Sequence, residues 1–527
     1  MNQSSEEEGK YGRCVICKQS STSIICQTCD SNFKEQECGK CKSCKQIKPI
    51  NKRERKVCHT CDLAFKERKF GKCIECKQVN TGLNWCQTCN SKRFQQDFNN
   101  WTSNNSDIDK FIQNNQLSAK NEHQLLEWIP YDRFYDIEYI AKGGFGKVYK
   151  ATWKDNNISH WDANEHRWKR HNRHNKYVVL KSLHDSQNIT LEFINEITLH
   201  VKIIEDKPLN QIIKCYGISQ DPSTKNYIMV MQYADNGSVR DYFNNRDSRK
   251  KPKPRSNFTF DFKLRHKIIV FDNIISGLKR IHVKGLVHRD LHIGNIVCFK
   301  SAICITDMGL CKPVNYKELE NTENNVYGAL PYIAPEILRG QDYTQASDIY
   351  SFGIIMYEVI SESPPYYGID QDEFLALSIC EGLRPKFNIK VPQLILDLIK
   401  KCLDANPSDR PNAIDLSRTF YEWIKELGAY LNSIENRTES IKTEIVKQIK
   451  ETEKMNNKLS SANKLPLNKN IGPTISKLLN FNNLPRPKNS DDYYSNYDNI
   501  SSIEYSERTD FLKSNNTIEC LDCEITD

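Results

Sequence analysis

The sequence predicts an α+β fold for the centre of the chain, preceded by small cysteine-rich modules stabilised by zinc. The apolar stretch at residues 227–233 is typical of a buried strand, and residues 349–360 are typical of a buried helix. Thirteen of the 21 cysteines lie before residue 90, which marks a separate region. A chain of 527 residues is long enough for about two to four domains, so we expect these parts to fold separately.

Composition and charge limit which partners and which cellular location we expect for this protein. The net charge of +8 is modest for this length, so it predicts some affinity for acidic partners without identifying nucleic acid as a ligand. Residues 1–11 form a polar N-terminus, and no run of about 18 apolar residues occurs, so neither secretion nor a membrane span is expected. The expected location is the cytoplasm, with the nucleus as the alternative. Thiols stay reduced there, so the cysteines need an explanation other than disulfides.

Residues 12–98 contain one cysteine pattern three times. Each unit opens with Gly-x-Cys-x-x-Cys-Lys-Gln and closes with Cys-x-Thr-Cys, and Cys38 falls outside the pattern. Two close pairs from different segments suit one zinc ion held by four thiolates, and units this small need the metal to fold. An iron-sulfur cluster and metal-free thiols are the alternatives. The predicted Zn²⁺ ligands are Cys14, Cys17, Cys26 and Cys29, then Cys41, Cys44, Cys58 and Cys61, then Cys73, Cys76, Cys86 and Cys89.

What these zinc knuckles bind is not written in the sequence. Metal-thiolate knuckles serve RNA binding, protein binding and purely structural purposes alike. A protein partner is the preferred prediction for this region, and nucleic acid is the alternative because lysine and arginine are frequent between residues 45 and 56.

Residues 134–427 contain, in order, the parts that phosphoryl transfer requires. The stretch Ile140-Ala-Lys-Gly143-Gly144-Phe145-Gly146-Lys-Val148 lets the backbone approach phosphate oxygens, because glycine has no Cβ atom. Lys181 ends an apolar run, and Glu196 follows at a helix-compatible distance for an ion pair. Then come Val287-His288-Arg289-Asp290-Leu-His292-Ile-Gly-Asn295, Asp307-Met-Gly309 and Ala334-Pro335-Glu336.

This ordered set resembles the protein kinases and is most similar to their tyrosine-kinase-like group. The resemblance implies a two-lobed fold with a small β-rich N-lobe and a larger helical C-lobe. It also implies an enzyme of signal transduction that transfers the γ-phosphoryl group of ATP to serine or threonine hydroxyls of protein substrates. Two alternatives come from other classes: a catalytically weak kinase-like scaffold, and a zinc-knuckle protein that binds nucleic acid.

The resemblance implies roles for individual residues. Asp290 orients the substrate hydroxyl, and Lys181, Glu196 and Asn295 are the other catalytic residues. Magnesium or manganese is held by Asn295 and Asp307. Asp348 braces the backbone of the catalytic loop, and Glu336 pairs with Arg410. The implied ATP-binding residues are Ile140, Gly143, Gly144, Phe145, Gly146, Val148, Val179, Lys181, Met231, Gln232 and Ala234.

Four departures from the family pattern bear on this prediction. Ala141 replaces the first loop glycine, Met308 replaces a phenylalanine and Val179 replaces an alanine, and none of these changes removes a catalytic group. His292 and Ala329 stand where serine/threonine kinases place a lysine and a threonine that hydrogen-bond together. Because both partners are absent, no polar group is left short of a bond. Specificity for tyrosine is not indicated by these residues either.

The activation segment is expected to need a phosphate, because Arg289 directly precedes Asp290 and a phosphate would neutralise that arginine. A loop ordered without phosphate is the alternative. The candidate phosphosites are Thr322, Tyr316 and Tyr327.

The remaining segments flank or interrupt the central domain. Residues 99–133 are predicted to be a linker or a short helix, and residues 463–527 a disordered tail rich in Asn, Ser and Tyr. An insertion at residues 154–177 is predicted to be a solvated basic loop, with metal binding and an acidic partner as alternatives. Residues 428–462 are predicted to be a helical extension, whose isoleucines either dock on the core or bind a partner.

Overall fold

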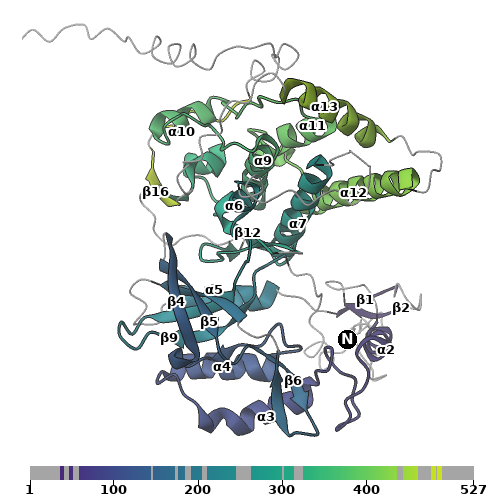
Figure 1. Cartoon of the computed structure of the whole chain (residues 1–527), viewed down its shortest axis with the longest axis vertical. Coiled ribbons are helices and arrows are strands. Elements are labelled where there is room, and N and C mark those ends of the chain that lie inside the picture. The colour runs from purple at the N-terminus through teal and green to yellow at the C-terminus, as the bar shows by residue number, and fades with distance from the viewer. Residues whose placement is uncertain are drawn as a thin grey trace, which may run out of the picture. The chain divides into compact units, whose positions relative to one another are not determined.

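The computed structural model describes residues 36–40, 47–51, 58–143, 146–171, 176–183, 191–203, 211–244, 263–299, 302–313, 325–435, 443–460, 476–481 and 483–489. The predicted N-terminal segment 1–11 lies outside them. The chain divides into two compact units (Figure 1). Unit 1 comprises residues 1–208 and 213–233, and unit 2 comprises residues 209–212 and 234–527. Within the described ranges, no helix is long and apolar enough to cross a bilayer.

A six-stranded sheet of order β3-β9-β10-β8-β5-β4 forms the centre of unit 1. Neighbouring strands are antiparallel except β3, which runs parallel to β9. The strands are β3 (Glu127–Trp128), β4 (Phe134–Gly143), β5 (Gly146–Trp153), β8 (Lys176–Leu183), β9 (Cys215–Gln220) and β10 (Tyr227–Gln232). Helix α5 (Leu191–Ile203) lies against β9.

The alternation of side chains gives the sheet two different faces. Val178 and Leu180 on β8 join Trp153 and Val230 in one buried apolar core. Successive residues of a strand point to opposite faces, so Lys181 points to the other face, with Glu196 of α5. The sheet therefore separates an apolar core from a face that carries charge.

The third cysteine unit, which contains Cys73, Cys76, Cys86 and Cys89, is packed into unit 1. Its helix α3 (Gln87–Asp97) lies beside α4 (Ser106–Ser118), and residues 99–133 contain both α4 and strand β3. Trp85 and Phe94 form a buried cluster with Leu125 and Ile158. Of the two predictions for this segment, the short helix is confirmed as α4. A linker is not what the structure has, because apolar positions of α4 such as Ile108 are buried.

The insertion at residues 154–177 is a β-hairpin rather than a solvated loop. Strands β6 (Ile158–Asp162) and β7 (Arg167–Arg170) pair antiparallel. The indole of Trp168 stacks on Phe94 of the third cysteine unit, with ring centroids 4.4 Å apart. The Arg170 guanidinium also pairs with Glu127 of β3 at 2.6 Å. Aromatic and ionic contacts thus join the insertion to the third cysteine unit and to strand β3.

Replacing Trp168 with alanine is expected to lower the free energy of unfolding of unit 1 by ~2–4 kcal/mol, because the variant loses both buried area and the stack on Phe94. Thermal unfolding followed by circular dichroism measures this loss. The matched control is Ile74→Ala, since Ile74 is 70% exposed on the same cysteine unit. Equal melting temperatures for the two variants would contradict the packing role of Trp168.

Two short strands lie in the cysteine-rich region before the third cysteine unit. Strands β1 (Gln36–Lys40) and β2 (Ile47–Asn51) pair antiparallel, and α2 (His59–Phe70) follows them.

Unit 2 is mainly helical, with a core formed by its long helices. Phe271 of α7, Phe352 of α9 and Phe420 of α12 are fully buried and contact one another through their rings. The helices are α6 (Val239–Asn244), α7 (Lys263–Val283), α8 (Pro335–Leu338), α9 (Gln345–Ser361), α10 (Glu373–Cys380), α11 (Gln393–Cys402), α12 (Ala413–Glu435) and α13 (Glu444–Ser460). Short strand pairs β11 (Leu286–Val287) with β14 (Lys312–Pro313) and β12 (Ile296–Cys298) with β13 (Ile303–Ile305) carry the intervening loops.

The C-terminal extension docks on this core. Ile445 and Ile449 of α13 are buried, and the Asn456 side chain of the same helix bonds the backbone of Lys390 in both directions. The sequence left open whether this extension docks on the core or binds a partner. In the structure it docks on the core.

The tail departs from the predicted disorder over residues 476–481 and 483–489. Strand β16 (Lys477–Asn480), yellow-green in Figure 1, pairs antiparallel with β15 (Asn325–Gly328). A polar segment can be ordered this way because a neighbouring strand supplies backbone hydrogen bonds, which need no core of the segment's own. Residues 463–475 and 490–527 of the predicted tail lie outside the described part of the chain.

Candidate active site

The unit 1 part of the predicted site is built on β8 and α5. The Lys181 Nζ atom lies 2.8 Å from Glu196 Oε1, and both side chains are buried. The ion pair expected from the sequence is therefore present. Because Val179 lies two residues before Lys181 on the same strand, both side chains share one face of the sheet. Met231, directly opposite Val179 in the register, shares that face.

The predicted phosphate-binding stretch spans the β4–β5 hairpin. Gly143 ends β4 and is paired with Gly146, the first residue of β5, and Ile140 is exposed on β4. Val148 is directly opposite Lys181 in the register of β5 and β8. Gly144 and Phe145 lie outside the described residues. Gln232 ends β10 in unit 1, whereas Ala234 belongs to unit 2.

The catalytic loop of unit 2 is held by Asp348 of α9. Its carboxylate accepts the backbone N–H groups of His288 at 2.8 Å and Arg289 at 3.0 Å, and contacts His282 Nε2 at 2.9 Å. The bracing role predicted for Asp348 is confirmed by these bonds. They fix Arg289 at a φ of +71°, a left-handed conformation that is costly for a side chain of this size. Asp290 is the next residue, so these bonds also restrict its position.

Asn295 and Asp307 present oxygen atoms that fit magnesium. The Asn295 amide nitrogen donates to the Asp290 carbonyl at 2.9 Å and to Asp290 Oδ2 at 3.3 Å, which orients the amide oxygen away from Asp290. The Asn295 carbonyl also accepts the Thr306 N–H at 2.9 Å, which holds the residue before Asp307 close by. Asp307 has a φ of +62°. Carboxylate and amide oxygens are the ligands that Mg²⁺ prefers, so these two residues are chemically suited to it.

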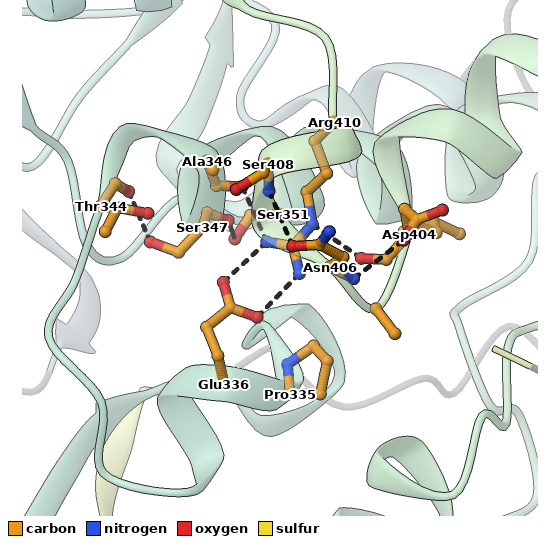
Figure 2. A network of polar contacts seen from close by, with 12 residues as sticks. Pro335, Glu336, Thr344, Ala346, Ser347, Ser351, Asp404, Asn406, Ser408 and Arg410 are labelled. Carbon is orange, nitrogen blue, oxygen red and sulfur yellow. Dashed lines mark hydrogen bonds and ion pairs between the residues drawn. The ribbon is translucent and has the colours of Figure 1, made fainter. Parts of the chain in front are cut away.

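A buried network links Glu336 of α8 to Arg410 (Figure 2). Both guanidinium NH groups donate to the two carboxylate oxygens at 2.7 Å, a bidentate pair. The same guanidinium donates to the carbonyls of Asp404 and Ala346. The predicted pairing of Glu336 with Arg410 is confirmed, and the network joins four segments of unit 2.

Sequence reasoning missed a hydroxyl at the centre of the site. The Ser476 Oγ atom, just before β16, lies 2.8 Å from both Asp290 carboxylate oxygens and 3.2 Å from His292 Nε2. Nothing in the local sequence around Ser476 marks it, since this contact joins residues 186 positions apart. Ala329, the other departure from the family pattern, is buried in the segment that follows β15.

Of the three phosphosite candidates, the structure describes Tyr327. It lies in β15, where its backbone carbonyl accepts the Tyr343 hydroxyl at 2.9 Å. Thr322 and Tyr316 lie outside the described residues.

The third cysteine unit brings its four predicted ligands together. The sulfur atoms of Cys73, Cys76, Cys86 and Cys89 all lie within 4.8 Å of one another, with 3.8 Å between Cys73 and Cys89 and 3.5 Å between Cys76 and Cys86. A zinc ion bound tetrahedrally by thiolates at about 2.3 Å separates the sulfurs by about 3.8 Å. Burial raises the pKa of the Cys86 and Cys89 thiols, so a cation is needed to keep them as thiolates.

The other predicted zinc ligands are described only in part. Cys58 is buried and Cys61 half-buried at the start of α2. Their partners Cys41 and Cys44, and the whole first set of Cys14, Cys17, Cys26 and Cys29, lie outside the described residues.

Comparison with known proteins identifies the central domain. A family model described as protein tyrosine and serine/threonine kinase matches residues 136–420. The chain belongs to this kinase family. The two units are accordingly its β-sheet N-lobe, with the cysteine modules attached, and its helical C-lobe, and the resemblance inferred from the sequence is confirmed.

The kinase has curated relatives with moderate identity. A probable serine/threonine-protein kinase of Dictyostelium discoideum is 26% identical over 275 residues, which cover 52% of this chain and 18% of the relative. A probable LIM domain-containing serine/threonine-protein kinase of the same organism is 27% identical and covers 54% and 38%. Mitogen-activated protein kinase kinase kinase 7 of Drosophila melanogaster is 25% identical and covers 55% and 37%. The chain thus spans less than two fifths of the length of these relatives.

Proposed function

We propose that this kinase transfers the γ-phosphoryl group of ATP to serine or threonine hydroxyls of protein substrates. The observation that carries the proposal is the contact between Asp290 and Ser476. Both carboxylate oxygens of Asp290 lie 2.8 Å from the hydroxyl of this serine, which directly precedes an extended strand. The relatives named as serine/threonine kinases support the same hydroxyl class.

The geometry supports a division of work among the residues. Asp290 lies within hydrogen-bond reach of a hydroxyl, as a proton acceptor must. Lys181, ordered by Glu196, is suited to orient phosphate oxygens. A magnesium ion held by Asn295 and Asp307 would neutralise negative charge on the phosphate groups of ATP. His292 Nδ1 accepts the Gly294 N–H at 3.1 Å, so the neutral ring carries its proton on Nε2 and offers it to the acceptor hydroxyl.

Transfer of labelled γ-phosphate from Mg-ATP to casein tests the proposal. The Asp290→Asn variant is expected to lose about 10²- to 10⁴-fold in rate, because asparagine cannot accept the proton. Asp342→Asn, which changes an exposed aspartate of the same lobe, is the matched control and is expected to retain the rate of the unaltered protein. Full activity of Asp290→Asn would contradict the proposal, and ATP binding without transfer by the unaltered protein would favour the scaffold alternative.

We also propose that Cys73, Cys76, Cys86 and Cys89 hold one zinc ion. The spacing of their sulfur atoms and the small size of the unit support this site. For the region as a whole we propose binding of a protein partner, and salt-dependent binding of mixed RNA or DNA by the full chain would favour nucleic acid instead.

A further inference from the structure

A segment of the C-terminal tail is bound to the kinase domain as an added strand. Strand β16 pairs with β15 in the register Val326 with Leu479 and Gly328 with Lys477. Leu479 is 6% exposed, whereas its neighbour Leu478 is 63% exposed. Addition of an extended peptide to a strand edge is a general mode of peptide recognition, in which backbone bonds give affinity and alternate side chains give specificity.

The residue before this strand lies where a substrate hydroxyl is expected. Ser476 has one hydroxyl proton, which it donates to the Asp290 carboxylate, and its oxygen accepts the Nε2–H of His292. Gly328, opposite Lys477 in the register, lies in a tight space, because a Cβ atom there would lie 3.2 Å from Ile333. Its φ of +153° is also one that other residues rarely adopt.

The tail has a second anchor on the same lobe. The Leu484 carbonyl accepts Arg339 Nε at 3.2 Å, the Lys488 N–H donates to the Cys380 carbonyl at 3.0 Å, and the Asn489 side chain accepts the Ala405 N–H at 2.8 Å. Contacts on both sides of Leu479 indicate that residues 476–481 and 483–489 both contact this surface, rather than one serine alone.

The segment can reach the site within its own chain. Helix α13 ends at Ser460 on the same lobe, and residues 461–475 connect it to Ser476. A chain of this length spans up to roughly 50 Å when extended. No second molecule is needed to bring Ser476 to Asp290.

We propose that Ser476 is a phosphoacceptor of the chain's own kinase domain, and that residues 476–480 occupy the substrate site until it is modified. This inference rests on the proposed function. The Ser476 Oγ atom forms a bond to the γ-phosphorus of ATP while the bond from that phosphorus to the β–γ bridging oxygen breaks. The electron pair leaves with ADP, and the hydroxyl proton passes to the Asp290 carboxylate. The products are phosphoserine and ADP.

The product is held less well than the substrate. A phosphoserine carries a charge of about −1.5 to −2 and would lie beside the Asp290 carboxylate, where like charges repel. Modification therefore favours release of β16 from β15. The unmodified segment acts as an intramolecular competitor of other substrates, and phosphorylation removes the competitor.

The test uses the full chain, treated with phosphatase and then incubated with Mg-ATP at a series of chain concentrations. Mass spectrometry is expected to find phosphate on Ser476 at an initial rate per molecule that does not change with concentration. An Asp290→Asn chain mixed with the active chain is expected to stay unmodified at Ser476 on the same time scale, because transfer occurs within one molecule.

Two variants separate docking from catalysis, with transfer to casein measured at initial rate before Ser476 is modified. Leu479→Asp places a charge at the buried position, so it is expected to release the segment. A segment docked in about nine of ten molecules raises the apparent KM for casein about tenfold, and Leu479→Asp is expected to remove that factor. Leu478→Asp, at the exposed neighbouring position, is the matched control and is expected to leave KM unchanged.

Failure of the inference is distinguishable from failure of the proposed function. Phosphorylation of casein with no phosphate on Ser476 would overturn the inference alone, as would a rate at Ser476 proportional to chain concentration or equal KM values for the two leucine variants. Absence of transfer to both casein and Ser476, even by the Leu479→Asp chain, would overturn the proposed function itself.

Discussion

Removal of zinc is expected to unfold the third cysteine unit, with the largest change in stability among our predictions. Structural zinc contributes about 10–16 kcal/mol of apparent binding free energy in small knuckles, and α3 has little core of its own beyond Phe94 and Trp85. Chelation of the metal is therefore expected to remove the hydrogen-exchange protection of the backbone amides of α3. Retention of that protection in metal-free protein would contradict a structural zinc site.

A cysteine variant identifies the ligand set. Cys86→Ser is expected to lower the bound zinc by one equivalent per chain, measured by elemental analysis of the purified protein. The matched control is Cys304→Ser, which changes a buried cysteine in β13 outside the cysteine modules. Equal zinc contents for the two variants would count against Cys86 as a ligand.

Breaking the bidentate pair in the C-lobe is expected to give the second largest effect. Arg410→Ala removes both donors of Glu336, whose carboxylate then stays buried without its charge partner. Loss of one member of a buried pair costs about 3–5 kcal/mol, so the melting temperature of the C-lobe should fall sharply. Calorimetry of the full chain measures this change.

Two further variants show that the cost arises from the unpaired charge. Arg418→Ala breaks an exposed pair with Asp415 in the same helix and is expected to cost no more than about 1 kcal/mol. The double variant Glu336→Gln with Arg410→Met removes both charges and is expected to be more stable than Arg410→Ala alone. A double variant as unstable as the single one would assign the loss to packing instead.

The site could be predicted from the sequence wherever its chemistry is encoded by neighbouring residues. Asp290 and Asn295 lie five positions apart on one loop, so their spacing already determines how they meet. The pair Glu336–Arg410 came instead from resemblance, and for Lys181–Glu196 the sequence offered only a compatible distance, because nothing local in the sequence fixes contacts between separate elements. The grouping of the four cysteines of the third unit was predictable from their spacing, whereas the cysteine sets that include residues outside the described ranges stay predictions.

Long-range docking was the part that the sequence did not reveal. The tail is polar, and polarity predicts disorder when a segment has to bury its own core. Strand β16 needs no such core, because β15 supplies its hydrogen bonds and one buried side chain, Leu479, suffices. The packing of the hairpin at β6 and β7 was likewise hidden, because Trp168 lies among basic residues and its partner, Phe94, lies far away in sequence.

The stack of Trp168 on Phe94 also determines where the chain can be cut. A fragment beginning at Phe134 would retain the complete family match yet lose Trp85, Phe94 and Leu125, leaving Trp168 and Ile158 uncovered on its surface. Uncovered apolar patches of this kind promote aggregation. The shortest soluble piece of this kinase is therefore expected to begin before the third cysteine unit, because that unit buries the apolar side chains of the β6–β7 insertion.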